Sequence, residues 1–193
     1  MTATASSYPL RFDVEYPDRL SRWKIFVKGL LAFPHILIVG ALGTVAYVMI
    51  VIAWFAILFT GRYPQGLFNF VVGVYRWNAN VSAYTSLLRD EYPPFTMEAG
   101  HYPVTFEVDY PERLSRWLIF VKWLLAIPNV IVLMVLGLAY YVTLIIAWFA
   151  ILFTGRYPSG LFGFGVGVQR WSLRVSAYAV YLFTDKYPPF SLS

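Results

Sequence analysis

The chain has 193 residues, of which 59% are hydrophobic and only 13% are charged, and its formal net charge is +5. Soluble globular domains carry about 25% charged residues, so this sequence has too few polar side chains to cover a water-facing surface. It contains no cysteine, which excludes disulfide scaffolds, thiolate metal sites and cysteine nucleophiles. The basic balance comes without a dense lysine and arginine cluster, which favours an anionic lipid surface over nucleic acid as partner.

The sequence is a tandem duplication. The segment 16–23 returns at 110–117, an offset of 94 residues (110 − 16), and aligning 8–88 with 102–182 gives 50 identities in 81 positions. A repeat of this length is the primary guide to architecture. We predict a polar N-terminal tail at 1–7, a first membrane repeat at 8–97 and a second at 98–193.

Each repeat opens with a short segment in which apolar and acidic residues alternate. These segments are 12–16 and 106–110, and a period of two residues is typical of a half-buried strand. We therefore expect short β-strands beside the membrane. A basic, tryptophan-bearing lead-in follows each strand, at 19–28 and 113–122.

A long uncharged run then fills each repeat, between Lys28 and Arg62 and between Lys122 and Arg156. As one helix it would measure about 50 Å, whereas the hydrocarbon core of a bilayer is about 30 Å thick. Basic residues flank both ends, and Gly43 at the midpoint permits a turn. These features favour a helical hairpin in each repeat, with even crossings that make the two repeats parallel.

Two alternatives stay open for the same run. In one, a single span from about Pro34 to Phe59 follows an interfacial helix that Pro34 breaks. In the other, the helix after the run crosses back, although Arg170 and Arg174 make that crossing costly. The fold class predicted overall is an all-α integral membrane protein with short juxtamembrane strands.

The last part of each repeat is an amphipathic helix that follows Gly-Arg-Tyr-Pro and precedes Tyr-Pro-Pro-Phe. Its spacing is typical of a helix lying in the interface with arginines among the phosphates. Gly-Arg-Tyr-Pro itself, at 61–64 and 155–158, is interpreted either as a helix C-terminus or as a lipid anchor. The candidate headgroup anchors are Arg22, Trp23, Arg62, Tyr63, Arg76, Arg116, Trp117, Arg156, Tyr157, Arg170 and Arg174.

Nothing in the sequence predicts catalysis, a metal or another cofactor. The only histidines are His35 and His101, which are too few for a metal site of fitted spacing. All acidic residues lie outside the apolar runs, and we expect them to pair weakly with arginines such as Arg19, Arg22, Arg113 and Arg116 at the surface.

The repeated motifs Tyr-Pro-x-Arg-Leu-Ser-Arg-Trp, Ala-Trp-Phe-Ala-Ile-Leu-Phe-Thr-Gly-Arg-Tyr-Pro and Tyr-Pro-Pro-Phe resemble a bacterial membrane family, DUF4389, over nearly the whole chain and twice. The resemblance implies a protein of the bacterial cytoplasmic membrane and carries over no reaction, substrate or site residue.

We therefore expect a non-enzymatic membrane component, namely a scaffold, an accessory subunit or a membrane-shaping protein. The expected partners are anionic lipids and a second copy or a membrane complex. The alternatives are a small oligomeric channel or transporter and, further behind, a lipid-modifying enzyme.

Overall fold

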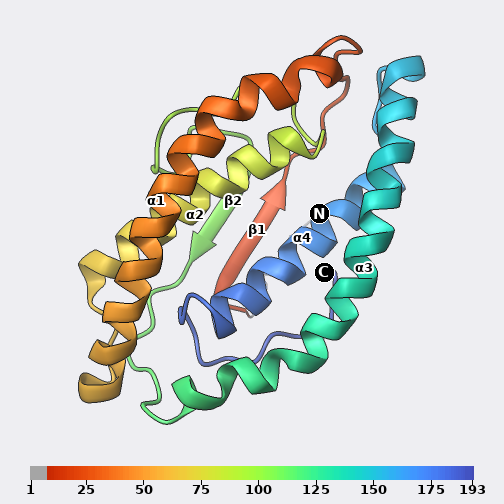
Figure 1. The fold of residues 1–193 in the computed structure, drawn as a ribbon. Coiled ribbons are helices and arrows are strands. Elements are labelled where there is room, and N and C mark those ends of the chain that lie inside the picture. The colour runs from red at the N-terminus through yellow and green to blue at the C-terminus, as the bar shows by residue number, and fades with distance from the viewer. Residues whose placement is uncertain (1–7) are drawn as a thin grey trace.

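The computed structural model describes residues 8–193, so the polar tail predicted at 1–7 lies outside the described part of the chain. Its described elements are four helices and a two-stranded sheet, and Figure 1 shows their arrangement. In chain order they are β1 (Leu10–Val14), α1 (Lys24–Thr60), α2 (Gln65–Thr85), β2 (Val104–Val108), α3 (Leu118–Thr154) and α4 (Ser159–Ala179).

The predicted helical hairpin is wrong, because α1 and α3 each run unbroken for 37 residues, which is roughly 55 Å at about 1.5 Å per residue. A glycine such as Gly43 costs a helix only about 1 kcal/mol. A turn in apolar surroundings would instead expose backbone groups with no hydrogen-bond partner. The single-span alternative is also wrong, because it placed a helix break at Pro34. Pro34 lies inside the continuous helix α1.

Both long helices end at the Gly-Arg-Tyr-Pro motif, which confirms its interpretation as a helix C-terminus. Gly61 has φ of 69° and donates its N–H to the Ile57 carbonyl oxygen, and Gly155 repeats this with φ of 71°. Glycine suits this position because the left-handed conformation penalises a Cβ atom.

The predicted amphipathic helices are present as α2 and α4, but their apolar faces are covered by protein rather than by lipid. Val71, Val74 and Tyr84 of α2 are buried, and α2 packs along α1 as α4 packs along α3. Each helix also stops before the double proline. Leu87, with φ of 63°, ends the helical path after α2.

The two repeats meet through their strands, which pair antiparallel with Phe12 opposite Phe106. These two residues are equivalents at the 94-residue offset, so an approximate two-fold axis passes between them. The strands begin two residues earlier than predicted, and their burial alternates. Leu10, Phe12 and Val14 face the core, whereas Arg11 and Asp13 are exposed.

The same axis makes α1 and α3 antiparallel to each other. The prediction of parallel repeats concerns the direction of this axis relative to the membrane, and it stays a prediction. Phe26, near the start of α1, lies 5.3 Å (ring centroids) from Trp148, near the end of α3. At the opposite ends of the two helices, the ring centroids of Trp54 and Phe120 lie 5.1 Å apart. Figure 1 shows the result: α1 and α3 flank the molecule and bow apart, with the sheet between and behind them.

Candidate membrane-binding surface

The helices α1 and α3 expose most of their apolar surface. On α1 the buried positions form one narrow stripe with steps of three, four and seven residues, which is the side that packs on α2. In the most hydrophobic stretch, only 22% of α1 residues and 6% of α3 residues are buried. A core helix of a soluble protein would be mostly buried, whereas these two helices are exposed and are long and apolar enough to cross a membrane.

The side of the molecule opposite α1 and α3 is charged. On the outer face of the sheet, Arg11 approaches Asp109 at 2.9 Å and Glu107 at 3.5 Å. Asp13 lies on the same face and pairs with Arg170 of α4. The inner face contributes Phe12 to a hollow that α3 also lines. Apolar and charged surfaces are therefore separated along the approximate two-fold axis.

One end of the molecule, where the start of α1 lies beside the end of α3, is called the first end here. It brings together predicted anchors from both repeats. Leu20 donates its backbone N–H to Gly155 O at 2.9 Å, which places Arg22 beside the motif of the second repeat. A Cβ atom on Gly155 would lie 3.6 Å from Arg22 Nε. Arg19, Arg22 and Arg156 line one hollow of about 520 Å³, and Trp23 next to them is 83% exposed.

The opposite end, where the end of α1 lies beside the start of α3, is called the second end. It repeats this arrangement with the roles of the two repeats exchanged. Leu114 donates to Gly61 O at 2.9 Å, and a Cβ on Gly61 would lie 3.5 Å from Arg116 Nε. Exposed Arg62 and Trp117 complete the group. Sequence spacing could not reveal these assemblies, because each joins the start of one repeat to the middle of the other.

These arginines have no carboxylate within 4.0 Å in the described residues 8–193, so the predicted pairing of acids with Arg19, Arg22, Arg113 and Arg116 is wrong. The acids pair elsewhere. Arg89 binds Glu91 at 2.7 Å, and its hydrogen bond to the carboxylate helps lower the pKa of Glu91 despite the opposing effect of burial. The exposed arginines at each end are therefore chemically able to bind an anion.

Five predicted anchors make hydrogen bonds to the protein or are buried in it. Tyr63 and Tyr157 are almost fully buried, and burial raises the pKa of both hydroxyls. Arg76 donates to Phe106 O and Met97 O. Its counterpart Arg170 donates to the strand oxygen Phe12 O and to Leu192 O. Arg174 is 3% exposed and donates to Ser193 O.

Two buried ion pairs were missed by the sequence analysis. Lys28 Nζ lies 2.8 Å from Asp90 and donates to Arg89 O, and it lies 5.2 Å from the Tyr84 ring centroid. The second repeat has the same arrangement around Lys122 and Asp185. The available signal was that a lysine opens each apolar run and that an aspartate stands at matching places before each Tyr-Pro-Pro-Phe motif.

The histidine near the start of the first apolar run makes a hydrogen bond and a ring contact inside the protein. Nδ1 of His35 accepts a hydrogen bond from Trp77 Nε1 at 3.0 Å, and its ring stacks on Phe95. In the second repeat Asn129 Oδ1 accepts from Trp171 Nε1 at 2.8 Å. Among the described residues, no group of three or more His, Asp or Glu side chains is placed to hold a metal ion.

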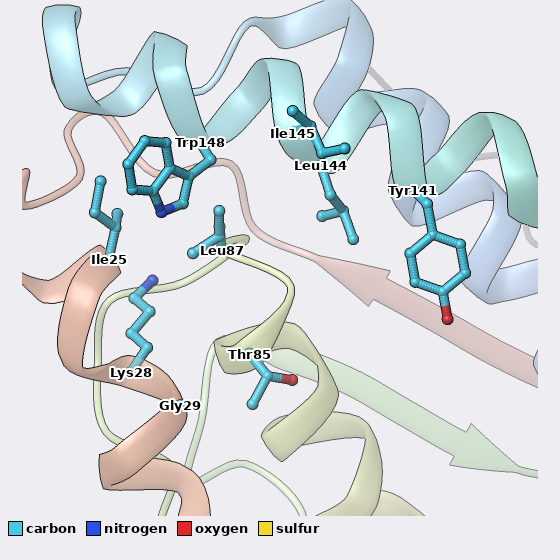
Figure 2. Close-up of a pocket in the computed structure, with 9 residues that line it drawn as sticks. All are labelled: Ile25, Lys28, Gly29, Thr85, Leu87, Tyr141, Leu144, Ile145 and Trp148. Carbon is cyan, nitrogen blue, oxygen red and sulfur yellow. The ribbon is translucent and has the colours of Figure 1, made fainter.

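Two hollows open on the α3 side of the molecule, one between α1 and α3 and the other between α2, α3 and α4. The first, of about 400 Å³, lies near the first end of the molecule and is shown in Figure 2. Its lining is mainly apolar and comes from α1, α3, the last residue of α2 and the segment after it. The second, of about 380 Å³, lies at the centre, above Phe12. Its polar lining residues are uncharged: Asn78, Ser82, Ser86, Tyr140, Tyr141, Gln169 and Ser172.

The fold and surface define a duplicated helical protein with two long apolar helices that could span a membrane and a small two-stranded sheet. The chain belongs to the DUF4389 family: the family model described as "Domain of unknown function (DUF4389)" matches residues 22–97 and again 116–191. The two matches confirm the tandem repeat. No curated protein and no solved structure matches the chain.

Proposed function

We propose that this protein is a non-enzymatic component of the bacterial cytoplasmic membrane that inserts into one leaflet and shapes or organises it. The two-fold axis lies along the membrane normal in this proposal. α1 and α3 face the acyl chains, and the charged outer face of the sheet faces water. Both ends, with their arginines and tryptophans, then lie at the headgroup level of the same leaflet.

The observation that carries this proposal is the separation of apolar and charged surfaces along the axis. If α1 and α3 instead crossed the bilayer, the axis would lie in the membrane plane. The outer face of the sheet, with Arg11, Asp13, Glu107 and Asp109, would then lie near the mid-plane. Charged groups facing lipid at that depth cost several kcal/mol each, which favours insertion from one side.

The length of the helices supports the same orientation. A helix of 37 residues is roughly 55 Å long, nearly twice the hydrocarbon thickness of about 30 Å. A helix lying along the leaflet has no such limit. Its charged ends, rather than the bilayer thickness, then set its length.

Insertion of this volume into one leaflet expands that leaflet relative to the other and bends the membrane. Purified protein added to one side of large liposomes containing phosphatidylglycerol should produce tubules or small vesicles. The control is a variant with Arg22, Arg62, Arg116 and Arg156 all changed to Gln, which should remodel less because its headgroup contacts are weaker. Liposomes whose shape is unchanged despite bound wild-type protein would contradict a membrane-shaping role.

One observation favours the alternative of a channel or transporter. The central hollow lies close to the two-fold axis and its polar lining residues are uncharged, as in pathways for neutral polar solutes. A flux assay in liposomes distinguishes the two proposals. Release of a small neutral solute, abolished by Asn78→Leu together with Ser172→Leu, would favour transport over membrane shaping.

A further inference from the structure

The apolar hollow near the first end is reachable from the surface of α1 and α3. At its rim, Tyr141 is 68% exposed and Ile145 is 60% exposed. Leu87 and Trp148 line it more deeply, and Figure 2 shows their side chains directed toward the space between α1 and α3. Its volume of about 400 Å³ is in the range of ligand pockets.

The lining of this hollow suits a hydrocarbon chain. The one ammonium group beside it belongs to Lys28, which is 2% exposed and paired with Asp90 at 2.8 Å. Its charge is therefore already neutralised inside the protein. Apart from this lysine, Thr85 and the Tyr141 hydroxyl, the lining consists of glycine and apolar side chains.

The hollow lies on the same end of the molecule as Arg19, Arg22 and Arg156. Ile25, on its α1 side, is three residues from Arg22, and Trp148, on its α3 side, is eight residues from Arg156. At about 1.5 Å per helical residue these separations are roughly 5 and 12 Å. An acyl chain extends about 15 Å from its headgroup, half the hydrocarbon thickness, so it spans this distance.

We propose that this end of the molecule is a site for one anionic phospholipid. Its phosphate binds Arg19, Arg22 and Arg156, and one acyl chain occupies the hollow between Ile25 and Trp148. This inference rests on the proposed membrane location and adds a specific lipid to it. Guanidinium groups without carboxylate partners bind phosphate through charge-assisted hydrogen bonds, and the apolar hollow explains why a lipid, rather than a free phosphate, is bound.

The two ends differ at several lining positions of this hollow, and the largest change in side-chain size is at Gly29. Gly29 lines the hollow, and a Cβ there meets no atom within 4 Å. The equivalent position of the second repeat holds Trp123. Gly29→Trp therefore adds an indole at the wall of the hollow, at a position where the Cβ atom itself has room. Leu30→Trp is the matched control, because Leu30 is the next residue, is 76% exposed and does not line the hollow.

The test counts lipids that stay bound to the full chain in detergent by native mass spectrometry, with equal phosphatidylglycerol and phosphatidylcholine added. The wild-type protein should retain one phosphatidylglycerol in preference to phosphatidylcholine. Gly29→Trp should weaken its retention at least about tenfold through lost chain burial. Arg22→Gln with Arg156→Gln should weaken it by a similar factor through lost phosphate contacts.

Leu30→Trp and the opposite-end variant Arg62→Gln with Arg116→Gln should keep the lipid. Retention unchanged in Gly29→Trp, equal retention of phosphatidylcholine, or displacement by glycerol phosphate would each overturn the site. All variants are also tested for flotation with liposomes. A variant that loses the specific lipid but still floats separates this site from membrane insertion, whereas wild-type protein that fails to float contradicts the proposed function itself.

Discussion

Phe12 lies opposite Phe106, its own duplicate, at the centre of the two-stranded sheet. The contacts around this pair are exchanged between repeats. Arg76 of the first repeat binds Phe106 O, and Arg170 of the second binds Phe12 O. Each repeat therefore completes the backbone hydrogen bonding of the other, and the two sequence units form one interlocked structure.

This exchange predicts that one repeat on its own should dimerise. The fragment 98–193 carries β2, α3 and α4, and two copies can pair Phe106 with Phe106 in the observed register. Light scattering in detergent should give a dimer. The control is Phe106→Asp in the same fragment, which removes the central buried ring. A fragment that is folded and monomeric would contradict the interlocked arrangement.

A second prediction concerns the contact between His35 and Trp77. His35→Asn should retain stability, since Asn129 already accepts the matching indole hydrogen bond from Trp171. His35→Leu should lower the free energy of unfolding by about 1–3 kcal/mol because it leaves the Trp77 N–H buried without an acceptor. Thermal unfolding in detergent measures both. Equal stability of the Leu and Asn variants would show that the hydrogen bond is unimportant.

A third prediction concerns the buried pair of Lys28 and Asp90. Lys28→Met should lower the free energy of unfolding by about 3–5 kcal/mol, because it leaves the partly buried carboxylate of Asp90 without its cation. The double variant Lys28→Met with Asp90→Asn should recover part of this loss, since Asn can still accept from the Ser21 N–H. Denaturation of both variants provides the comparison, and a double variant less stable than Lys28→Met would count against this explanation.

A fourth prediction concerns the exposed arginines at the helix ends. Arg62→Ala with Arg156→Ala should weaken binding to phosphatidylglycerol vesicles roughly 30-fold at low salt, at about 1 kcal/mol for each arginine near an anionic surface. Arg11→Ala, on the outer face of the sheet, is the control and should change binding little. Sedimentation with vesicles measures the affinity, and unchanged binding of the double variant would refute the anchor interpretation.

Much of the fold was predictable because it depends on local pattern. The repeat, the strands, the amphipathic helices and the Gly61 helix end follow from periodicity and glycine chemistry. The hairpin prediction was wrong because bilayer thickness was applied to a helix whose orientation was unknown. A long apolar helix that lies along a leaflet is not limited by the thickness of the membrane.

The site was only partly predictable, since it forms between repeats. Arg22 and Arg156 are 134 positions apart (156 − 22) in the sequence and line the same hollow. Tyr63 and Arg76 were both predicted to be lipid anchors, yet tertiary packing engages both inside the protein. No sequence period distinguishes an arginine that stays exposed from one that binds the carbonyl oxygen of a neighbouring strand.

The most direct test of one-sided insertion is the sidedness of the two ends of α1. The chain has no cysteine, so Arg22→Cys and Arg62→Cys each introduce a single label site, and Asp13→Cys reports on the sheet. In sealed vesicles of uniform orientation, a membrane-impermeant maleimide should label all three from the same side. Labelling of positions 22 and 62 from opposite sides would contradict the account and show that α1 crosses the membrane.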